Sequence, residues 1–199
     1  MTVLLGRQCR IGFMTILFLL FAVGTSWGQK VAKDYIEKHK FTAMSLSKES
    51  GIPASIILGV SMIESGMGKS RNCTLLHNYF GVKGKNQLSK IAGAPRSAYK
   101  QYPNPGASFK DFVRIVKSKK YYPVLKGVND YEKWLIAMNQ YGYASAKGKW
   151  IAEIISVIKK YKLDAIDREV LVFDDDSFPI WGVDSTRRLD MLEEIQKGK

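Results

Sequence analysis

The sequence predicts a mainly helical protein of the α+β class, with a small irregular or β insert directly after one glutamate. Apolar residues recur at helical spacing along most of the chain, whereas glycines and Pro95 interrupt short alternating stretches in residues 78–102. Length is the third observation, because residues 29–199 are enough to bury a sufficient hydrophobic core in one domain.

The first 28 residues have the pattern of a secretory signal. Arg7 and Arg10 precede an apolar run at residues 11–23, and Ser26 and Gly28 supply small residues before the expected cleavage site. The run of 13 residues is short for a membrane span, so an uncleaved anchor is the less favoured alternative. We therefore expect export to the periplasm or the extracellular space, without stable membrane insertion after cleavage.

Cysteine content and charge limit the function of the exported part. Cys9 lies within the signal, so Cys73 would remain alone and could not form an internal disulfide. Residues 29–163 hold 24 Lys and Arg against 8 Asp and Glu, whereas residues 164–199 hold 5 against 10. A basic exported domain favours an anionic partner such as a cell-wall glycan, a membrane surface or nucleic acid. Export and the lack of a recognisable module argue against nucleic acid.

Helical periodicity continues through this exported part. Gly51-Ile52-Pro53 separates a first helical region from residues 53–63, which are apolar around most of their circumference and predict a buried helix. Pro53 fits its first turn and Gly66 its end. Asp130 is a candidate N-cap. Helices are expected at residues 31–40 and 41–50 (two short helices or one bent helix), 108–116, 131–140 and 149–161.

Residues 164–199 form an acidic C-terminal extension, which we expect to pack on the domain because it contains aromatic residues. A lid over a basic cleft is the alternative. Its Asp174-Asp175-Asp176 run lacks the glycine and glutamate of a calcium loop, and His39 and His77 do not form a zinc-binding motif. We expect no metal and no cofactor.

Glu64 follows the buried helix directly and is the candidate catalytic group. A carboxylate at the C-terminal end of such a helix meets both desolvation and the negative pole of the helix dipole. Both raise its pKa, as a general acid near neutral pH requires. Gly66 and Gly68 would let a substrate approach closely. The alternative is a glutamate that simply reaches water.

Two motifs resemble the glucosaminidase domains of glycoside hydrolase family 73, which include bacterial autolysins. They are Glu64-Ser-Gly-Met-Gly-Lys-Ser70 and Asn78-Tyr-Phe-Gly-Val-Lys-Gly84, where the family typically reads E-S-G-W-G-K-S and N-L-F-G-I-K-G. Met67 and Tyr79 are the departures. The resemblance covers residues 36–162.

This resemblance implies a lysozyme-like fold over residues 29–163, with helices around a cleft and a small β lobe as its opposite wall. It also implies cleavage of the β-1,4 bond that follows N-acetylglucosamine in peptidoglycan glycan strands, by a protein that we expect to be a monomer. Glu64 would be the general acid. Tyr143-Ala-Ser-Ala-Lys147 partly matches a third family motif, Y-A-T-D-P, whose tyrosine points into the cleft near the reacting sugar. Core packing is the alternative for Tyr143 and for Phe80. The residues expected to bind substrate are Tyr79, Phe80, Lys83, Tyr141 and Trp150.

A second catalytic carboxylate, which glycosidases commonly use, is not evident. The sequence has no Asp or Glu between Glu64 and Asp111. Three explanations stay open: the substrate's acetamido group acts as nucleophile, a distant acid such as Asp111 or Asp130 positions water, or the protein binds glycan and barely cuts it. A lytic transglycosylase, which needs one glutamate, is a further alternative. A cysteine nucleophile at Cys73, with His77 four residues later, has little other support.

Overall fold

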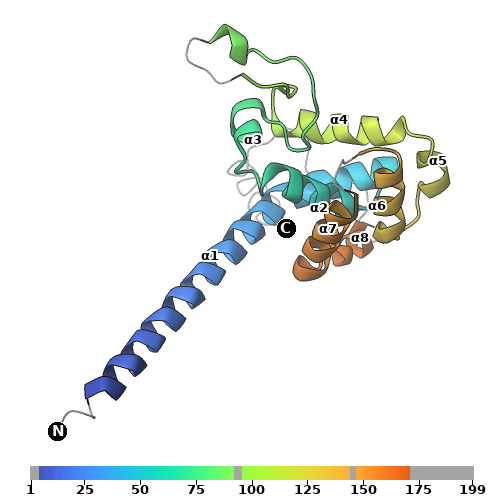
Figure 1. The fold of residues 1–199 in the computed structure, drawn as a ribbon. Helices are drawn as coiled ribbons and strands as arrows, with labels where there is room; N and C mark the ends of the chain where they lie inside the picture. The colour runs from blue at the N-terminus through green and yellow to red at the C-terminus, as the bar shows by residue number, and fades with distance from the viewer. Residues whose placement is uncertain (1–4, 92–95, 144–146, 171–199) are drawn as a thin grey trace, which may run out of the picture.

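The computed structural model describes the backbone of residues 5–91, 96–143 and 147–170, and side chains from residue 28 onward except those of Ser89 and Lys147. Helix α1 (Leu5–Ser50) is one continuous helix whose N-terminal part extends away from the other helices (Figure 1). Residues 31–50, expected as two short helices or one bent helix, belong to this one helix, because no glycine or proline interrupts that stretch before Gly51. No helix in the described part of the chain combines the length and hydropathy that crossing a membrane requires.

Helix α2 (Ala54–Ser65) is the buried helix that the sequence predicts, and it packs against α1 and three later helices. Pro53 precedes its first turn, and Gly66 ends it in the left-handed conformation with φ of 56°. The helix carries ten buried residues, so its position is fixed by hydrophobic packing on nearly every side. Its last turn presents Glu64.

Six further α-helices and one 3-10 turn complete the described fold. Helix α4 begins three residues before the predicted start, because Asn104 caps it by accepting from the Ala107 amide and Pro105 occupies its first turn. Asp130 caps α6 as the sequence predicts, accepting from the Glu132 and Lys133 amides. The remaining elements are α3 (Arg71–Leu76), η1 (Leu88–Lys90), α4 (Pro105–Lys117), α5 (Tyr122–Leu125), α6 (Tyr131–Gln140), α7 (Lys147–Tyr161) and α8 (Asp164–Val170).

The lobe that the sequence predicts to contain β-structure has no β-sheet in its described residues. This lobe, residues 78–102, contains one isolated antiparallel bridge, between Lys83 and Tyr99. Two asparagine side chains hold it together. Asn78 donates from Nδ2 to the carbonyls of Val82 and Lys100, at 2.8 and 2.7 Å, and Asn86 donates to two carbonyls across the lobe. Three backbone hydrogen bonds also cross the lobe, from the amides of Gly84, Lys100 and Gln101 to the carbonyls of Ala98, Val82 and Lys85. The described residues thus form an irregular insert, and the expected small β lobe is not confirmed.

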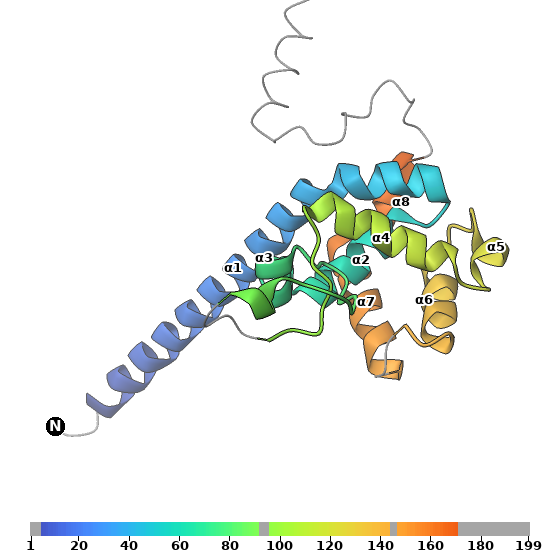
Figure 2. The ribbon, with the colours of Figure 1, turned by 90° about the horizontal axis from the view of Figure 1, so that it is seen from above.

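The start of the acidic extension is part of the core. Helix α8 packs against α1 and α2, where Asp167 accepts hydrogen bonds from the amide and hydroxyl of Ser55 at 2.8 and 2.5 Å. Asp167 therefore satisfies the first turn of α2, whose amides have no partner within the helix. In Figure 2 α8 lies beside α1, at the end of the described chain. Residues 171–199, for which we considered packing or a lid, lie outside the described residues.

Candidate active site

Glu64 is half-buried in the last turn of α2, and each of its carboxylate oxygens lies against a different part of the chain. The indole Nε1 of Trp150, from α7, donates to Oε1 at 2.8 Å. The other oxygen faces Gly81 of the lobe, where a Cβ would lie 3.2 Å from Oε2. Gly81 has φ of 64°, which favours glycine, so both its backbone and the space beside it suit this residue. The carboxyl is thus held between α7 and the lobe.

The environment of Glu64 favours its protonated form. Burial raises its pKa, the Trp150 hydrogen bond partly opposes this, and the negative charge of Glu153 adds to the rise. The sequence predicts the direction and the main cause. The charge of Glu153 was missed, although it lies one helical turn after Trp150 on α7 and hence on the same face.

The side chain of Tyr143 lies next to those of Glu64 and Trp150. Its half-buried ring packs 5.3 Å from the Trp150 ring and 5.9 Å from the Phe112 ring, between centroids. Its hydroxyl donates to the Phe80 carbonyl over a long 3.4 Å. Burial, followed by the nearby charge of Glu64, raises its pKa well above the usual range, so the hydroxyl remains a hydrogen-bond donor.

Tyr79 and Phe80 lie in the core, which for Phe80 is the alternative that the sequence left open and for Tyr79 differs from the expected place along a glycan groove. Tyr79 is 6% exposed, among aromatic rings that include His39 and Phe109. Phe80 is 3% exposed and stacks on Phe112 with centroids 4.2 Å apart. The lobe is attached to α4 by these rings, so their apolar area is already used in packing.

Trp150 also differs from its expected substrate-binding role, because it is 5% exposed and its polar atom is bound to Glu64. We regard it as a residue that positions the acid. Lys83 and Tyr141 are exposed, on the lobe and directly after α6 respectively. The Tyr141 ring lies 5.3 Å from that of Tyr121 and leaves about half of the residue accessible, at 49%.

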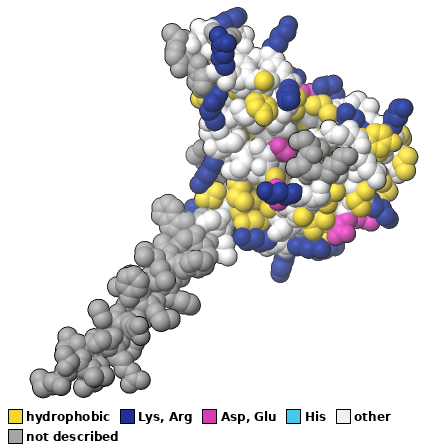
Figure 3. All heavy atoms as spheres, viewed as in Figure 1, with side chains coloured by type: hydrophobic (Ala, Val, Ile, Leu, Met, Phe, Trp, Pro, Cys, Tyr) yellow, Lys and Arg dark blue, Asp and Glu magenta, His cyan; other side chains and the backbone are white. Residues whose placement is uncertain are grey.

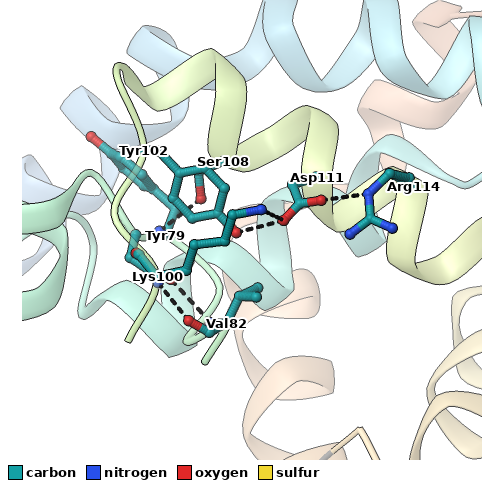
Figure 4. Close-up of polar contacts among 8 residues, drawn as sticks. Tyr79, Val82, Lys100, Tyr102, Ser108, Asp111 and Arg114 are labelled. Carbon is teal, nitrogen blue, oxygen red and sulfur yellow. Dashed lines mark hydrogen bonds and ion pairs between the residues drawn. The ribbon is translucent and has the colours of Figure 1, made fainter. Parts of the chain in front are cut away.

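The two distant acids considered as partners of Glu64 have other roles. Asp111, on α4, accepts from Lys100 Nζ at 2.8 Å, Arg114 Nε at 2.6 Å and the Tyr102 hydroxyl at 2.8 Å, as Figure 4 shows. Although burial opposes it, these hydrogen bonds hold the pKa of Asp111 below its usual value. Asp130 caps α6. Both carboxylates stabilise the scaffold.

Cys73 is buried, its pKa is raised by burial, and it shares a hydrogen bond with Tyr79. His77 ends α3 in a left-handed conformation, and the buried His39 has its pKa lowered to about 4 by burial. Since a nucleophilic thiol needs a lowered pKa or a nearby base, this environment does not activate Cys73. Among the described residues, no group of three or more His, Cys, Asp or Glu side chains is placed to hold a metal ion.

A mostly helical fold with a half-buried acid at the end of its central helix, beside a lobe, fits the lysozyme-like fold of glycoside hydrolases. Residues 40–163 match the Glucosaminidase family, described as mannosyl-glycoprotein endo-beta-N-acetylglucosaminidase, and the chain belongs to this family. No curated protein sequence shows a significant match to the chain.

Solved structures of low sequence identity share the fold. The catalytic domain of the autolysin Auto from Listeria monocytogenes is 18% identical, with a TM-score of 0.56 over 68% of this chain and 87% of that one. The glycoside hydrolase domain of Salmonella typhimurium FlgJ is 22% identical, with a TM-score of 0.53 over 70% and 92%. A peptidoglycan hydrolase from Sphingomonas sp. A1 is 19% identical, with a TM-score of 0.52 over 76% and 99%.

Proposed function

We propose that this protein is an exported peptidoglycan hydrolase that cleaves the β-1,4 bond following N-acetylglucosamine, with Glu64 as general acid. The carrying observation is the environment of that carboxyl, held between Trp150 and Gly81 with a raised pKa. Membership of the glucosaminidase family supports the reaction. The similar structures include an autolysin and a peptidoglycan hydrolase, which supports peptidoglycan as the substrate.

Glu64 would donate its proton to the bridging oxygen as the bond from C1 of the sugar breaks. Trp150 fixes Oε1, so Oε2, on the side of Gly81, would carry the proton that is transferred to the substrate. Tyr143 would lie beside the reacting sugar, where its protonated hydroxyl can donate a hydrogen bond.

For the nucleophile we favour the substrate's own acetamido group. Its carbonyl oxygen would attack C1 as the leaving oxygen departs, and water would then open the cyclic intermediate and return a proton to Glu64. The lack of any acidic residue between Glu64 and Asp111, and the use of Asp111 in ion pairs, support this mechanism. Lys83 and Tyr141, both exposed, are our candidates for contacts with more distant parts of the glycan.

The experiment incubates purified protein with cell-wall sacculi and identifies the released fragments by mass spectrometry. We expect reducing N-acetylglucosamine ends from the wild type and none from Glu64→Gln, whose side chain can still accept from Trp150. Anhydro-muramyl ends would identify a lytic transglycosylase instead. If neither protein releases fragments and both sediment with sacculi, the protein is a glycan-binding protein on this fold.

Export is a separate part of the proposal and rests on the signal-like pattern of residues 1–28. Full-length protein should be found outside the cytoplasm with Gln29 as its new N-terminus, and a chain that lacks residues 1–28 should remain inside. An intact N-terminus on protein recovered from the membrane fraction would contradict cleavage.

A further inference from the structure

A basic hollow lies in the lobe, lined by residues that follow Gly81 in the sequence. It has a volume of about 430 Å³. In Figure 3 Lys and Arg side chains surround the outer end of the lobe, at the top of the molecule. We define the basic hollow by its lining residues, which are Gly84, Lys85, Asn86, Gln87, Lys90, Arg96 and Ser97.

The positive charge of this hollow is not balanced within the lobe. The lobe, residues 78–102, contains five Lys and Arg and no acid. Lys100 is neutralised by Asp111 on α4, at 2.8 Å. In the described part of the chain, by contrast, no carboxylate pairs with Lys85, Lys90 or Arg96. Three like charges around one hollow repel each other and attract an anion.

The backbone that carries these charges is fixed by hydrogen bonds. Asn86 donates from Nδ2 to the carbonyls of Ser97 and Tyr99 at 2.7 and 2.9 Å, and its Oδ1 accepts from the Leu88 amide. The Gln87 amide donates to the side chain of Gln101 at 2.9 Å. The two sides of the hollow are therefore joined before any ligand arrives, which lowers the entropic cost of binding.

The hollow is also connected directly to the acid. Gly81 touches Glu64, and the chain continues through the Lys83–Tyr99 bridge to Gly84, whose amide donates to the Ala98 carbonyl at 3.0 Å. Lys85 follows Gly81 by four residues, so their Cα atoms lie at most about 14 Å apart. A group attached to a sugar near the cleaved bond could reach the hollow, whereas the sugar itself would lie at Glu64.

We propose that the basic hollow binds the carboxylate groups of the peptide stems that peptidoglycan glycans carry. This inference rests on the proposed function, because it assigns the side groups of the same substrate. The glycan chain is held at Glu64 and the stem at Lys85, Lys90 and Arg96, so the protein favours glycan that still bears peptides.

The test compares two variants with equal loss of charge. The first replaces Lys85, Lys90 and Arg96 by Gln. The control replaces by Gln three exposed lysines, which are Lys33 of α1, Lys117 at the end of α4 and Lys120 just after it. Both are made in the Glu64→Gln background, where fragments bind without being cut. The ligands are soluble glycan fragments with intact stems, the same fragments with amidated stem carboxylates, and fragments freed of stems by an amidase.

We expect the hollow variant to bind stem-bearing fragments roughly tenfold more weakly than the control, because each exposed charge contributes modestly. Amidated and stem-free fragments should bind both variants equally. Equal binding of stem-bearing fragments by the two variants would overturn the proposal. So would an equal loss for stem-free fragments, which would place the glycan itself in the hollow. Binding of poly(glycerol phosphate) at the hollow without binding of stems would make a wall phosphate the ligand instead.

The measurement stays informative if the proposed hydrolase activity fails, since it requires no cleavage. If the wild type cuts no sacculi, yet substitution of the hollow weakens stem binding, only the enzyme mechanism is refuted. Far-ultraviolet circular dichroism and thermal unfolding of both triple variants check that they fold. If the triple variant does not fold, the single Lys90→Gln variant, set against Lys120→Gln, tests the same difference.

Discussion

Substitution of Gly81 by alanine tests the contact on which the proposed acid depends. The new Cβ would lie 3.2 Å from Oε2 of Glu64, which is closer than carbon and oxygen normally approach. Glu64 has little freedom to retreat, because its other oxygen accepts the Trp150 hydrogen bond at 2.8 Å. Relief of the contact must therefore stretch that bond or move the lobe.

The expected effect of Gly81→Ala has two parts, one on stability and one on activity. A side chain in the left-handed conformation of Gly81 costs about 1–2 kcal/mol of folding free energy, whatever the surroundings. Displacement of the carboxyl costs activity, because a misplacement of about 1 Å lowers rates by roughly a hundredfold. We expect Gly81→Ala to fold, to be less stable by about 1–2 kcal/mol, and to have a kcat lowered by at least about tenfold.

Gly127→Ala is the matched control. Gly127 has φ of 78°, and a Cβ there would meet nothing within 4 Å. It should lose similar stability in urea unfolding and keep its kcat on sacculi. If the two variants retain the same kcat, the carboxyl that faces Gly81 is not the catalytic acid and the reasoning fails.

Three further predictions follow from the same contacts. Glu64→Gln should be more stable than wild type at pH 8, by about 1.4 kcal/mol for each unit by which folding raises the pKa of Glu64. The reason is that the folded protein disfavours the charged carboxylate. In thermal unfolding the difference should vanish below about pH 4, where the carboxyl is protonated in both states. Trp150→Phe should raise the pKa of Glu64 and move the alkaline limb of kcat/KM to higher pH, whereas Glu153→Gln should move it to lower pH; shifts in the same direction would contradict the assignment. Gly59→Ala should lower the free energy of unfolding by about 1–3 kcal/mol, although alanine favours helix. The reason is that its Cβ would lie 3.1 Å from two isoleucines of α7. An unchanged midpoint in urea unfolding would contradict this packing.

The central helix and its acid could be predicted because several local signals agree. Pro53, the apolar circumference and Gly66 all indicate one buried helix, and Glu64 follows from its last turn. Asp130 was equally clear, since an aspartate before a helical pattern has a defined capping geometry. Such signals come from residues that are close in the sequence, so they can be recognised without knowing the tertiary structure.

Other features depend on contacts between distant residues. Alternation in the lobe suggested strands, but Asn78 and Asn86 satisfy the backbone there with side-chain amides. Tyr79 and Phe80 face α4 instead of a groove, which requires knowing how the lobe is attached. The hydrogen bond from Trp150 to Glu64 joins residues 86 positions apart, so no local pattern could reveal it.

Burial is the main cause of the raised pKa of Glu64, and the two other influences on it come from α7, which links the packing of the core to the chemistry. Trp150 lowers the pKa and Glu153 raises it, from adjacent turns of one helix. The position of that helix against α2 is set by Gly59, whose missing side chain lets Ile154 approach closely. A shift of α7 would change both influences on the carboxyl at once. Gly59→Ala should therefore move the alkaline limb of kcat/KM as well as the unfolding midpoint. A Gly59→Ala protein that loses stability but keeps its pH profile would show that α7 adjusts without moving Trp150 or Glu153.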